Sequence, residues 1–158
     1  MPPLNLIRES ELFKGLSQDV LEKILSLCRE AEYPRGATIF SEHSPAQHLY
    51  VLEYGLVTLR IDTPTGAEKV MVTAIRDRGE VFGWSALVEP HVYTSTAVCL
   101  ESCRVVALEG AGLLRTLEEN PEAGFVVMKR LAAIIASRLR KAQTALTSAL
   151  TPGLISHG

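Results

Sequence analysis

The sequence predicts a mainly β fold with flanking helices: a jelly roll or β-roll (a double-stranded β-helix), with helices before it and one long helix after it. Between residues 33 and 108, short runs rich in β-branched and aromatic residues alternate with Gly and Pro turns at nearly regular spacing. This pattern is typical of an antiparallel roll rather than of a βαβ sheet. On either side, apolar residues recur three and four positions apart, as in amphipathic helices. The length of 158 residues, with 47% hydrophobic and 22% charged, fits one domain over residues 1–150 and a tail at 151–158.

The N-terminal part of the chain is expected to be helical. We interpret residues 10–30 as helix, with Ser17 as a plausible N-cap because its hydroxyl can accept from the first free N–H groups. The apolar residues at helical spacing are Val20, Leu21, Ile24, Leu25 and Cys28.

The central strands are separated by short turns. They are expected at residues 38–40, 48–53, 56–61, 68–75, 94–100 and 103–108. The last two are expected to form a hairpin, which would place Cys99 and Cys103 on adjacent strands. Three cysteines are too few for a disulfide framework, and no further Cys or clustered His completes a metal site, so we interpret them as small core residues.

Charge and hydropathy argue against two kinds of partner. The formal net charge is −2, so no global field attracts the chain to DNA or to acidic lipid. No apolar run approaches the ~18 residues that would span a bilayer. The first residues also lack the basic start and apolar core of a signal peptide. We therefore expect a cytoplasmic protein.

The last helix, expected at residues 121–149, has two apolar faces. One is a heptad seam with alternating steps of four and three, formed by Met128, Ala132, Ile135, Leu139, Ala142, Leu146 and Ala149. The other, formed by Val127, Leu131 and Ile134, is suited to packing on the chain's own β-roll. Two faces indicate two neighbours, so we expect a homodimer; a single wide core-facing stripe is the alternative. The basic residues of this helix are interpreted as solvated surface: Lys129, Arg130, Arg138, Arg140 and Lys141.

The stretch at residues 79–97 carries the strongest functional signal. It reads GEVFGWSALVEPHVYTSTA, in which Gly83 opens about one turn of helix and Pro90 ends it. The free N–H groups at a helix start point at one spot, which in principle suits an anion.

This stretch resembles the phosphate-binding cassette of cyclic nucleotide-binding domains of the Crp/Fnr type and of kinase regulatory subunits. The matching residues are Phe82, Gly83, Ala86, Leu87 and Thr96. The resemblance covers about residues 10–147 and implies a parallel homodimer through the last helix and a cyclic-nucleotide effector. Two positions depart from the family. Trp84 stands where the family has a Glu that accepts from the ribose 2′-hydroxyl, and Tyr93 where it has an Arg that pairs with the cyclic phosphate.

These two replacements weaken the expected binding of a cyclic nucleotide such as cAMP. A charge-assisted hydrogen bond contributes ~1.5–3 kcal/mol, so losing two costs ~3–6 kcal/mol, or roughly two to four decades in affinity. Trp84 and Tyr93 either form an aromatic wall for a base or another small ligand, or they plug the site. The candidate ligand-binding residues are Phe82, Gly83, Trp84, Ser85, Ala86, Leu87, Tyr93, Thr94 and Ser95.

Two main functional hypotheses follow, neither of them enzymatic. The first is a sensor or regulatory module that binds a nucleotide-like or anionic effector and signals through its dimer helix. The second is a dimerising scaffold without a ligand. A cupin-type metalloenzyme is a remote alternative, since such a site needs converging His ligands and the histidines include no His-x-His pair; they are His43, His48, His91 and His157.

No DNA-reading module is expected. In Crp/Fnr regulators the dimer helix runs into a helix-turn-helix, and here only residues 151–158 follow the predicted helix. We therefore expect no direct DNA binding, and a transcriptional role would need a separate protein partner.

Overall fold

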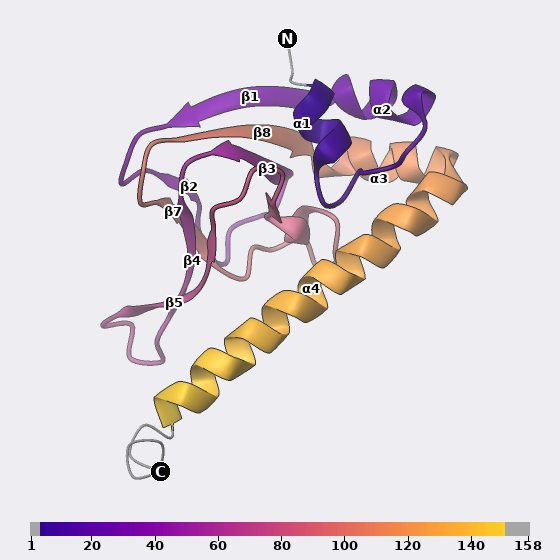
Figure 1. Cartoon of the computed structure of the whole chain (residues 1–158). Helices are drawn as coiled ribbons and strands as arrows, with labels where there is room; N and C mark the ends of the chain where they lie inside the picture. Colours follow the sequence, from indigo (N-terminus) through magenta and orange to yellow (C-terminus); the bar gives the residue numbers. More distant parts are fainter. Residues whose placement is uncertain (1–3, 151–158) are drawn as a thin grey trace.

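The computed structural model describes residues 4–150. Along the chain the elements are α1 (Leu4–Glu9), α2 (Gln18–Leu25), β1 (Cys28–Tyr33), β2 (Thr38–Phe40), β3 (His48–Tyr54), β4 (Val57–Asp62), β5 (Lys69–Ile75), β6 (Val81–Phe82), the 3-10 turn η1 (Trp84–Ala86), β7 (Thr96–Cys99), β8 (Cys103–Glu109), α3 (Gly110–Glu119) and α4 (Pro121–Leu150). The short helices α1, α2 and α3 gather at one end of the roll, and α4 runs diagonally from that end past the strands (Figure 1).

The strands form two antiparallel sheets, which confirms the predicted mainly β fold. One sheet has the order β1-β8-β3-β6 and the other the order β2-β7-β4-β5. β8 lies between β1 and β3, and β4 lies between β5 and β7. Neighbours in a sheet are therefore distant in sequence, except for the β4–β5 pair, as expected for a roll.

The predicted hairpin of the last two strands is wrong. β7 and β8 belong to different sheets, so the three residues between them turn a corner of the roll. At this corner the N–H of Leu100 donates to the carbonyl of Leu56 at 2.8 Å. Cys99 and Cys103 consequently lie on opposite sheets, where both are buried and free. Burial raises the pKa of Cys99 to about 12, which suits a core residue rather than a reactive thiol.

The predicted N-terminal helix is shorter than expected. The Ser17 cap is confirmed, since its hydroxyl accepts from the N–H of Val20 at 3.4 Å. The helix ends at Leu25, however, and Cys28 begins β1 opposite Leu108 of β8. Cys28 satisfies the helical spacing and a strand position equally well, and pairing with β8 decides between them.

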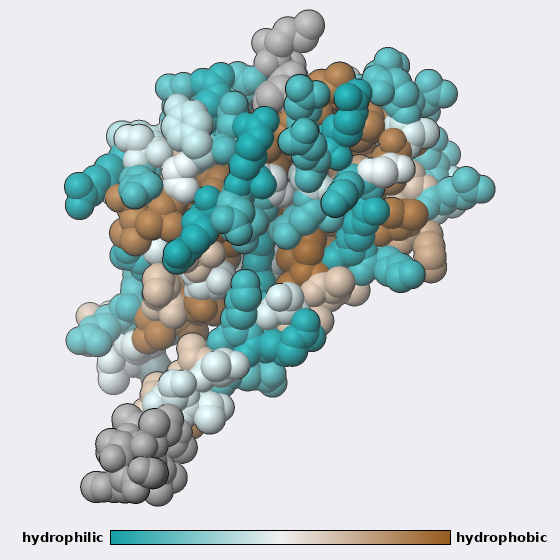
Figure 2. All heavy atoms as spheres, viewed as in Figure 1, coloured by the Kyte–Doolittle hydropathy of each residue, from teal (hydrophilic) through white to brown (hydrophobic). Residues whose placement is uncertain are grey.

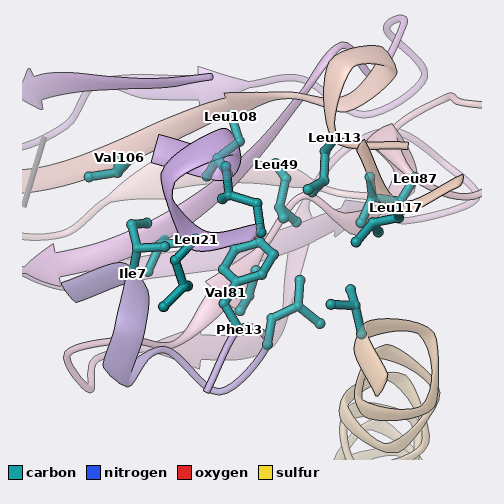
Figure 3. Packing of buried hydrophobic residues seen from close by; sticks show 14 of the residues in the cluster. Ile7, Phe13, Leu21, Leu49, Val81, Leu87, Val106, Leu108, Leu113 and Leu117 are labelled. Carbon is teal, nitrogen blue, oxygen red and sulfur yellow. The ribbon is translucent and has the colours of Figure 1, made fainter. Parts of the chain in front are cut away.

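Two clusters of buried residues stabilise the fold. The first joins α1, α2 and α3 to the outer face of the β1-β8-β3-β6 sheet, with Leu49, Val106 and Leu108 supplied by strands (Figure 3). The second fills the inside of the roll and is aromatic at its centre, where the rings of Phe40, Tyr50, Phe82 and Tyr93 meet.

The long helix α4 has one buried face, as predicted. Val127 and Leu131 are fully or nearly fully buried in the first cluster, and Ile134 packs against it. Seam residues of the predicted second face are exposed in the single chain: Met128 at 36%, Leu139 at 56% and Leu146 at 59%. In the space-filling view, hydrophobic surface lies along the line where α4 crosses the body of the molecule (Figure 2).

In the described part of the chain, no helix combines the length and apolar character needed to cross a membrane. The predicted tail at 151–158 lies outside the described residues.

Candidate functional site

The cassette begins where β6 ends, at a glycine that the backbone requires. Gly83 has a φ of 80°, in the left-handed region that favours glycine. A Cβ at this position would lie 3.2 Å from both the carbonyl oxygen of His48 and the ring of Tyr50. The single turn η1 follows, closed by the N–H of Leu87 donating to the carbonyl of Trp84 at 2.8 Å. The predicted glycine-opened turn of helix is thus present, as a 3-10 turn.

Tyr93 points into the roll. Its side chain is only 5% exposed, and its ring stacks on Phe40 with centroids 3.9 Å apart and planes 12° apart. Its hydroxyl donates to the carbonyl of His48 at 2.6 Å and accepts from the His48 N–H at 3.2 Å. Burial raises the pKa of Tyr93, so the phenol stays neutral and offers no charge to a ligand.

The loop before β3 fixes the backbone of Tyr93 in this position. The N–H of Tyr93 donates to the carbonyl of Ser44 at 3.0 Å, and the N–H of His43 donates to the carbonyl of Tyr93 at 2.8 Å. Both ends of the tyrosine, backbone and hydroxyl, are therefore held by neighbouring segments.

The space left in the cassette is very small. Its cavity has a volume of about 30 Å³, and Gly83, Trp84, Ser85, Tyr93, Thr94 and Ser95 all line it. Small-molecule sites usually measure ~300–1,000 Å³. This cavity has room for no more than a water or two, and Tyr93 is one of its walls. Trp84 and Tyr93 do meet at one concavity, as the sequence pattern predicts.

Three predicted site residues do not line this cavity. Phe82, with 0% exposure, belongs to the aromatic interior of the roll, and Leu87 belongs to the helical core. Ala86 is buried beneath α3, where its carbonyl lies 2.4 Å from the position of a Cβ on Gly110. These three buried residues support the cassette without lining its cavity. Thr96 is also directed elsewhere, since its hydroxyl accepts from the N–H of Glu42 at 2.9 Å.

Trp84 turns the other way, towards α4. The guanidinium carbon of Arg138 lies 5.0 Å from the centroid of the Trp84 ring, a cation–π geometry. Arg138 is 7% exposed, so its assignment to a solvated basic face is wrong. Burial lowers its pKa, opposed by the nearby carboxylates of Glu11 and Glu80.

A sequence signal for Arg138 did exist. It follows Val127, Leu131 and Ile134 in steps of four, three and four, so it lies on the same face of α4 as these core residues. The charge of Arg138 favours an exposed side chain, whereas its position on the apolar face of α4 favours burial. In the structure the side chain is buried.

A second cavity adjoins the cassette. This groove between the β4–β5 strands, the cassette and α4 has a volume of about 220 Å³. It shares Leu59, Trp84, Thr94 and Ser95 with the small cassette cavity. From α4 it is lined by Ile135, Arg138, Leu139 and Ala142, so three residues of the predicted dimer seam face a hollow of their own chain.

The comparisons with known proteins decide the family. A family model described as the cyclic nucleotide-binding domain matches residues 30–120. The chain belongs to the cyclic nucleotide-binding domain family. The domain is 23% identical over 154 residues to a CRP-like cAMP-activated global transcriptional regulator of Mycobacterium tuberculosis, covering 96% of this chain and 66% of that protein. It is 31% identical over 140 residues to the cyclic AMP receptor protein of Thermus thermophilus, covering 89% of this chain and 62% of that protein.

Solved structures agree with this assignment. The crystal structure of a candidate cyclic nucleotide-binding protein from Geobacter metallireducens GS-15 superposes with a TM-score of 0.76 at 32% identity, covering 88% of this chain and 99% of that one. The domain spans about two thirds of the length of the curated regulators named above. Sequence and fold thus agree that the chain is a member of the cyclic nucleotide-binding domain family.

Two histidines of the described chain, His43 and His91, have polar neighbours. The side chains of Glu42, His43 and Asp62 bring their possible metal-ligand atoms within 4.8 Å of one another. Asp62 is already paired with Lys69 at 2.7 Å, and this group contains one histidine rather than the several that a cupin site needs. His91 is only partly exposed, with its Nδ1 3.0 Å from the carbonyl oxygen of Ser85.

Proposed function

We propose that the domain is a Crp/Fnr-type regulatory module whose effector binds in the groove beside the cassette and whose signal passes through α4. The observation that supports this most is the composition of the groove walls. Trp84 and Ser95 come from the cassette region, and Arg138 comes from the long helix. An occupant of the groove contacts both elements at once, so binding can shift α4 relative to the roll.

A cyclic nucleotide in the family's binding mode is disfavoured. The cassette has neither the Arg nor the Glu of the family, and its cavity of about 30 Å³ has no room for a phosphate while Tyr93 is in place. Displacing Tyr93 would break its stacking on Phe40 and its hydrogen bond to His48. The effector is therefore a small anionic molecule rather than cAMP.

The signalling element is a homodimer through α4. Three large apolar side chains at heptad positions would be exposed to water in a monomer: Met128, Leu139 and Leu146. A second copy that packs along this seam buries them and borders the groove. The family is one of regulatory domains rather than enzymes, and we propose the same for this chain, as a cytoplasmic protein that acts on a partner protein and does not itself contact DNA.

Thermal unfolding and mass measurements test this function. cAMP, cGMP and cyclic dinucleotides at millimolar concentration are expected to leave the melting temperature nearly unchanged. Light scattering during size-exclusion chromatography is expected to give the mass of a dimer. A monomer at all concentrations would overturn signalling through α4, and a large stabilisation by cAMP would overturn the altered effector.

A dimerising scaffold without a ligand is the second candidate, and the filled cassette favours it. Both functions predict a dimer. Only the regulatory module predicts a small molecule that raises the melting temperature, so a domain that responds to no anion would be a scaffold.

A further inference from the structure

Arg138 is a buried cation with fewer acceptors than it has donors. A guanidinium carries five N–H groups. In the described residues, Nη2 lies 3.4 Å from Oε1 of Glu11 and 3.8 Å from Oε2 of Glu80, both long for hydrogen bonds. Nη1 is buried and has no hydrogen-bond partner there. A buried donor without an acceptor is unfavourable, and Arg138 makes fewer hydrogen bonds than its guanidinium can donate.

The two carboxylates position Arg138 without saturating it, because backbone groups already use them. Oε1 of Glu11 accepts from the N–H of Val81 at 2.9 Å. Oε1 of Glu80 accepts from the N–H groups of Arg76 and Asp77 at 3.1 and 2.8 Å. The carboxylates are thus fixed to β6 and the turn before it, and Arg138, which they contact, is also one of the residues that line the groove.

The groove offers an apolar body and one charged end. Ile61 and Val72 contribute aliphatic wall from the sheet, and Ile135 and Leu139 contribute it from α4. Thr94 and Ser95 line the groove from the segment that follows the cassette turn. A volume of about 220 Å³ is below the ~300 Å³ of the smallest usual ligand sites. The ligand is therefore smaller than a nucleotide and largely apolar.

We propose that this groove binds a small monocarboxylate with an apolar body, whose carboxylate accepts hydrogen bonds from the Arg138 guanidinium. This inference rests on the proposed function and names its effector class. Planar carboxylates match the guanidinium fork, and the pair is charge-assisted. A single negative charge is favoured over a doubly charged phosphate, because Glu11 and Glu80 lie within 4 Å of the same guanidinium. Anion recognition is thereby moved from the cassette to α4.

The single tryptophan provides the assay. The chain contains one Trp, and it is the ring that Arg138 covers. Trp84 fluorescence and the melting temperature are followed while acetate, butyrate, hexanoate, benzoate and phenylacetate are titrated at constant ionic strength. Hexanoate and benzoate are expected to give saturable changes in emission, with hexanamide and benzamide at least about tenfold weaker, since the amides lose the charge-assisted bond.

Four variants locate the binding. Arg138→Gln should weaken carboxylate binding by about 10- to 100-fold, and Arg138→Lys should fall between it and the wild type. Arg140→Gln removes the same charge from an exposed position on the same helix and should leave binding unchanged. Val72→Phe fills the groove from β5 and leaves Arg138 intact, so it should block binding. This variant keeps the test valid if Arg138→Gln fails to fold.

The possible outcomes distinguish the proposed effector class from the proposed regulatory function. Failure of every carboxylate to bind, or equal binding by Arg138→Gln, overturns the inference. If a cyclic nucleotide binds the groove independently of Arg138, the regulatory module stands and the effector class is wrong. If carboxylates bind as expected but the chain is monomeric, the effector class stands and signalling through the α4 dimer is wrong.

Discussion

Tyr93→Ala tests whether the cassette is occupied by its own side chain. The substitution removes a ring that is 5% exposed and stacked on Phe40 at 3.9 Å. Aromatic-to-Ala changes in a core cost ~3–5 kcal/mol in the free energy of unfolding. The two hydrogen bonds between the hydroxyl and the backbone of His48 are lost as well. For a domain of this size each kcal/mol shifts the melting temperature by ~2–4 °C, so we expect a loss of roughly 6–20 °C.

Urea unfolding of matched variants measures this. Tyr54→Ala is the control, because Tyr54 is 53% exposed and its truncation should change the free energy of unfolding by no more than ~0.5 kcal/mol. Tyr93→Phe keeps the ring and removes the hydroxyl, which isolates the hydrogen bonds at ~1–3 kcal/mol. If Tyr93→Ala loses less than about 1 kcal/mol, the ring does not fill the roll and the plugged cassette is refuted.

Three further predictions concern the turn, the helix and the buried charges. Gly83→Ala should lower the free energy of unfolding more than Gly66→Ala does. Both glycines have a positive φ, which costs an alanine ~1–2 kcal/mol, but of the two only Gly83 has neighbours within 4 Å of a new Cβ. Equal losses in urea unfolding would show that crowding at Gly83 does not matter. Leu139→Glu should convert the expected dimer to monomer in light scattering while Thr144→Glu, also on the exposed part of α4, should not, and a Leu139→Glu dimer would place the interface elsewhere. Burial raises the pKa of Glu11 above its ordinary 4.5, against the lowering effects of the Val81 N–H, Arg138 and Lys141, with Glu80 raising it further. A raised native pKa means that the stability contributed by Glu11 is present below its ordinary pKa and is lost as the pH rises through the native pKa. The free energy of unfolding of the wild type, relative to Glu11→Gln, should therefore fall as the pH rises through that range. A rise would show that the native pKa of Glu11 is not raised.

Much of the architecture could be predicted because its signals are local. Ser17 indicates the start of its helix because its hydroxyl can cap free N–H groups, and Gly83 indicates a left-handed turn because few other residues tolerate one. The buried face of α4 follows from the spacing of Val127 and Leu131, which needs no knowledge of what lies against it.

The errors arise where a distant partner decides the structure. The expected link of two residues, Glu101 and Ser102, between two β-rich runs predicts a hairpin. In the structure β7 pairs with β4 and β8 pairs with β3, both far away in sequence. Cys28 completes a helical spacing, yet its backbone pairs with Leu108 of β8. Periodicity fixes which face of an element is apolar; it does not fix which neighbour covers that face.

The cassette residues show the same limit at the level of single side chains. The sequence could place Trp84 and Tyr93 at one pocket but left open whether they form a wall or a plug. In the structure they do different things: Tyr93 turns inward onto Phe40, and Trp84 turns outward under Arg138. The direction of each ring depends on a partner from another segment: the His48 carbonyl accepts from the Tyr93 hydroxyl, and the Arg138 guanidinium of α4 lies over the Trp84 ring. Neither partner is adjacent in sequence to the ring that it holds.

The two rings together change where a ligand can act. With Tyr93 inside the roll, a molecule held by η1 alone would have about 30 Å³ and would reach α4 only through Trp84. A molecule in the neighbouring groove contacts Ile135, Arg138 and Leu139 directly. Leu139 also belongs to the exposed apolar seam, so the same turn of helix borders the groove and the predicted interface. Binding and dimerisation then involve the same segment of α4, and a ligand that packs against that segment must alter the free energy of association unless it contacts both states equally.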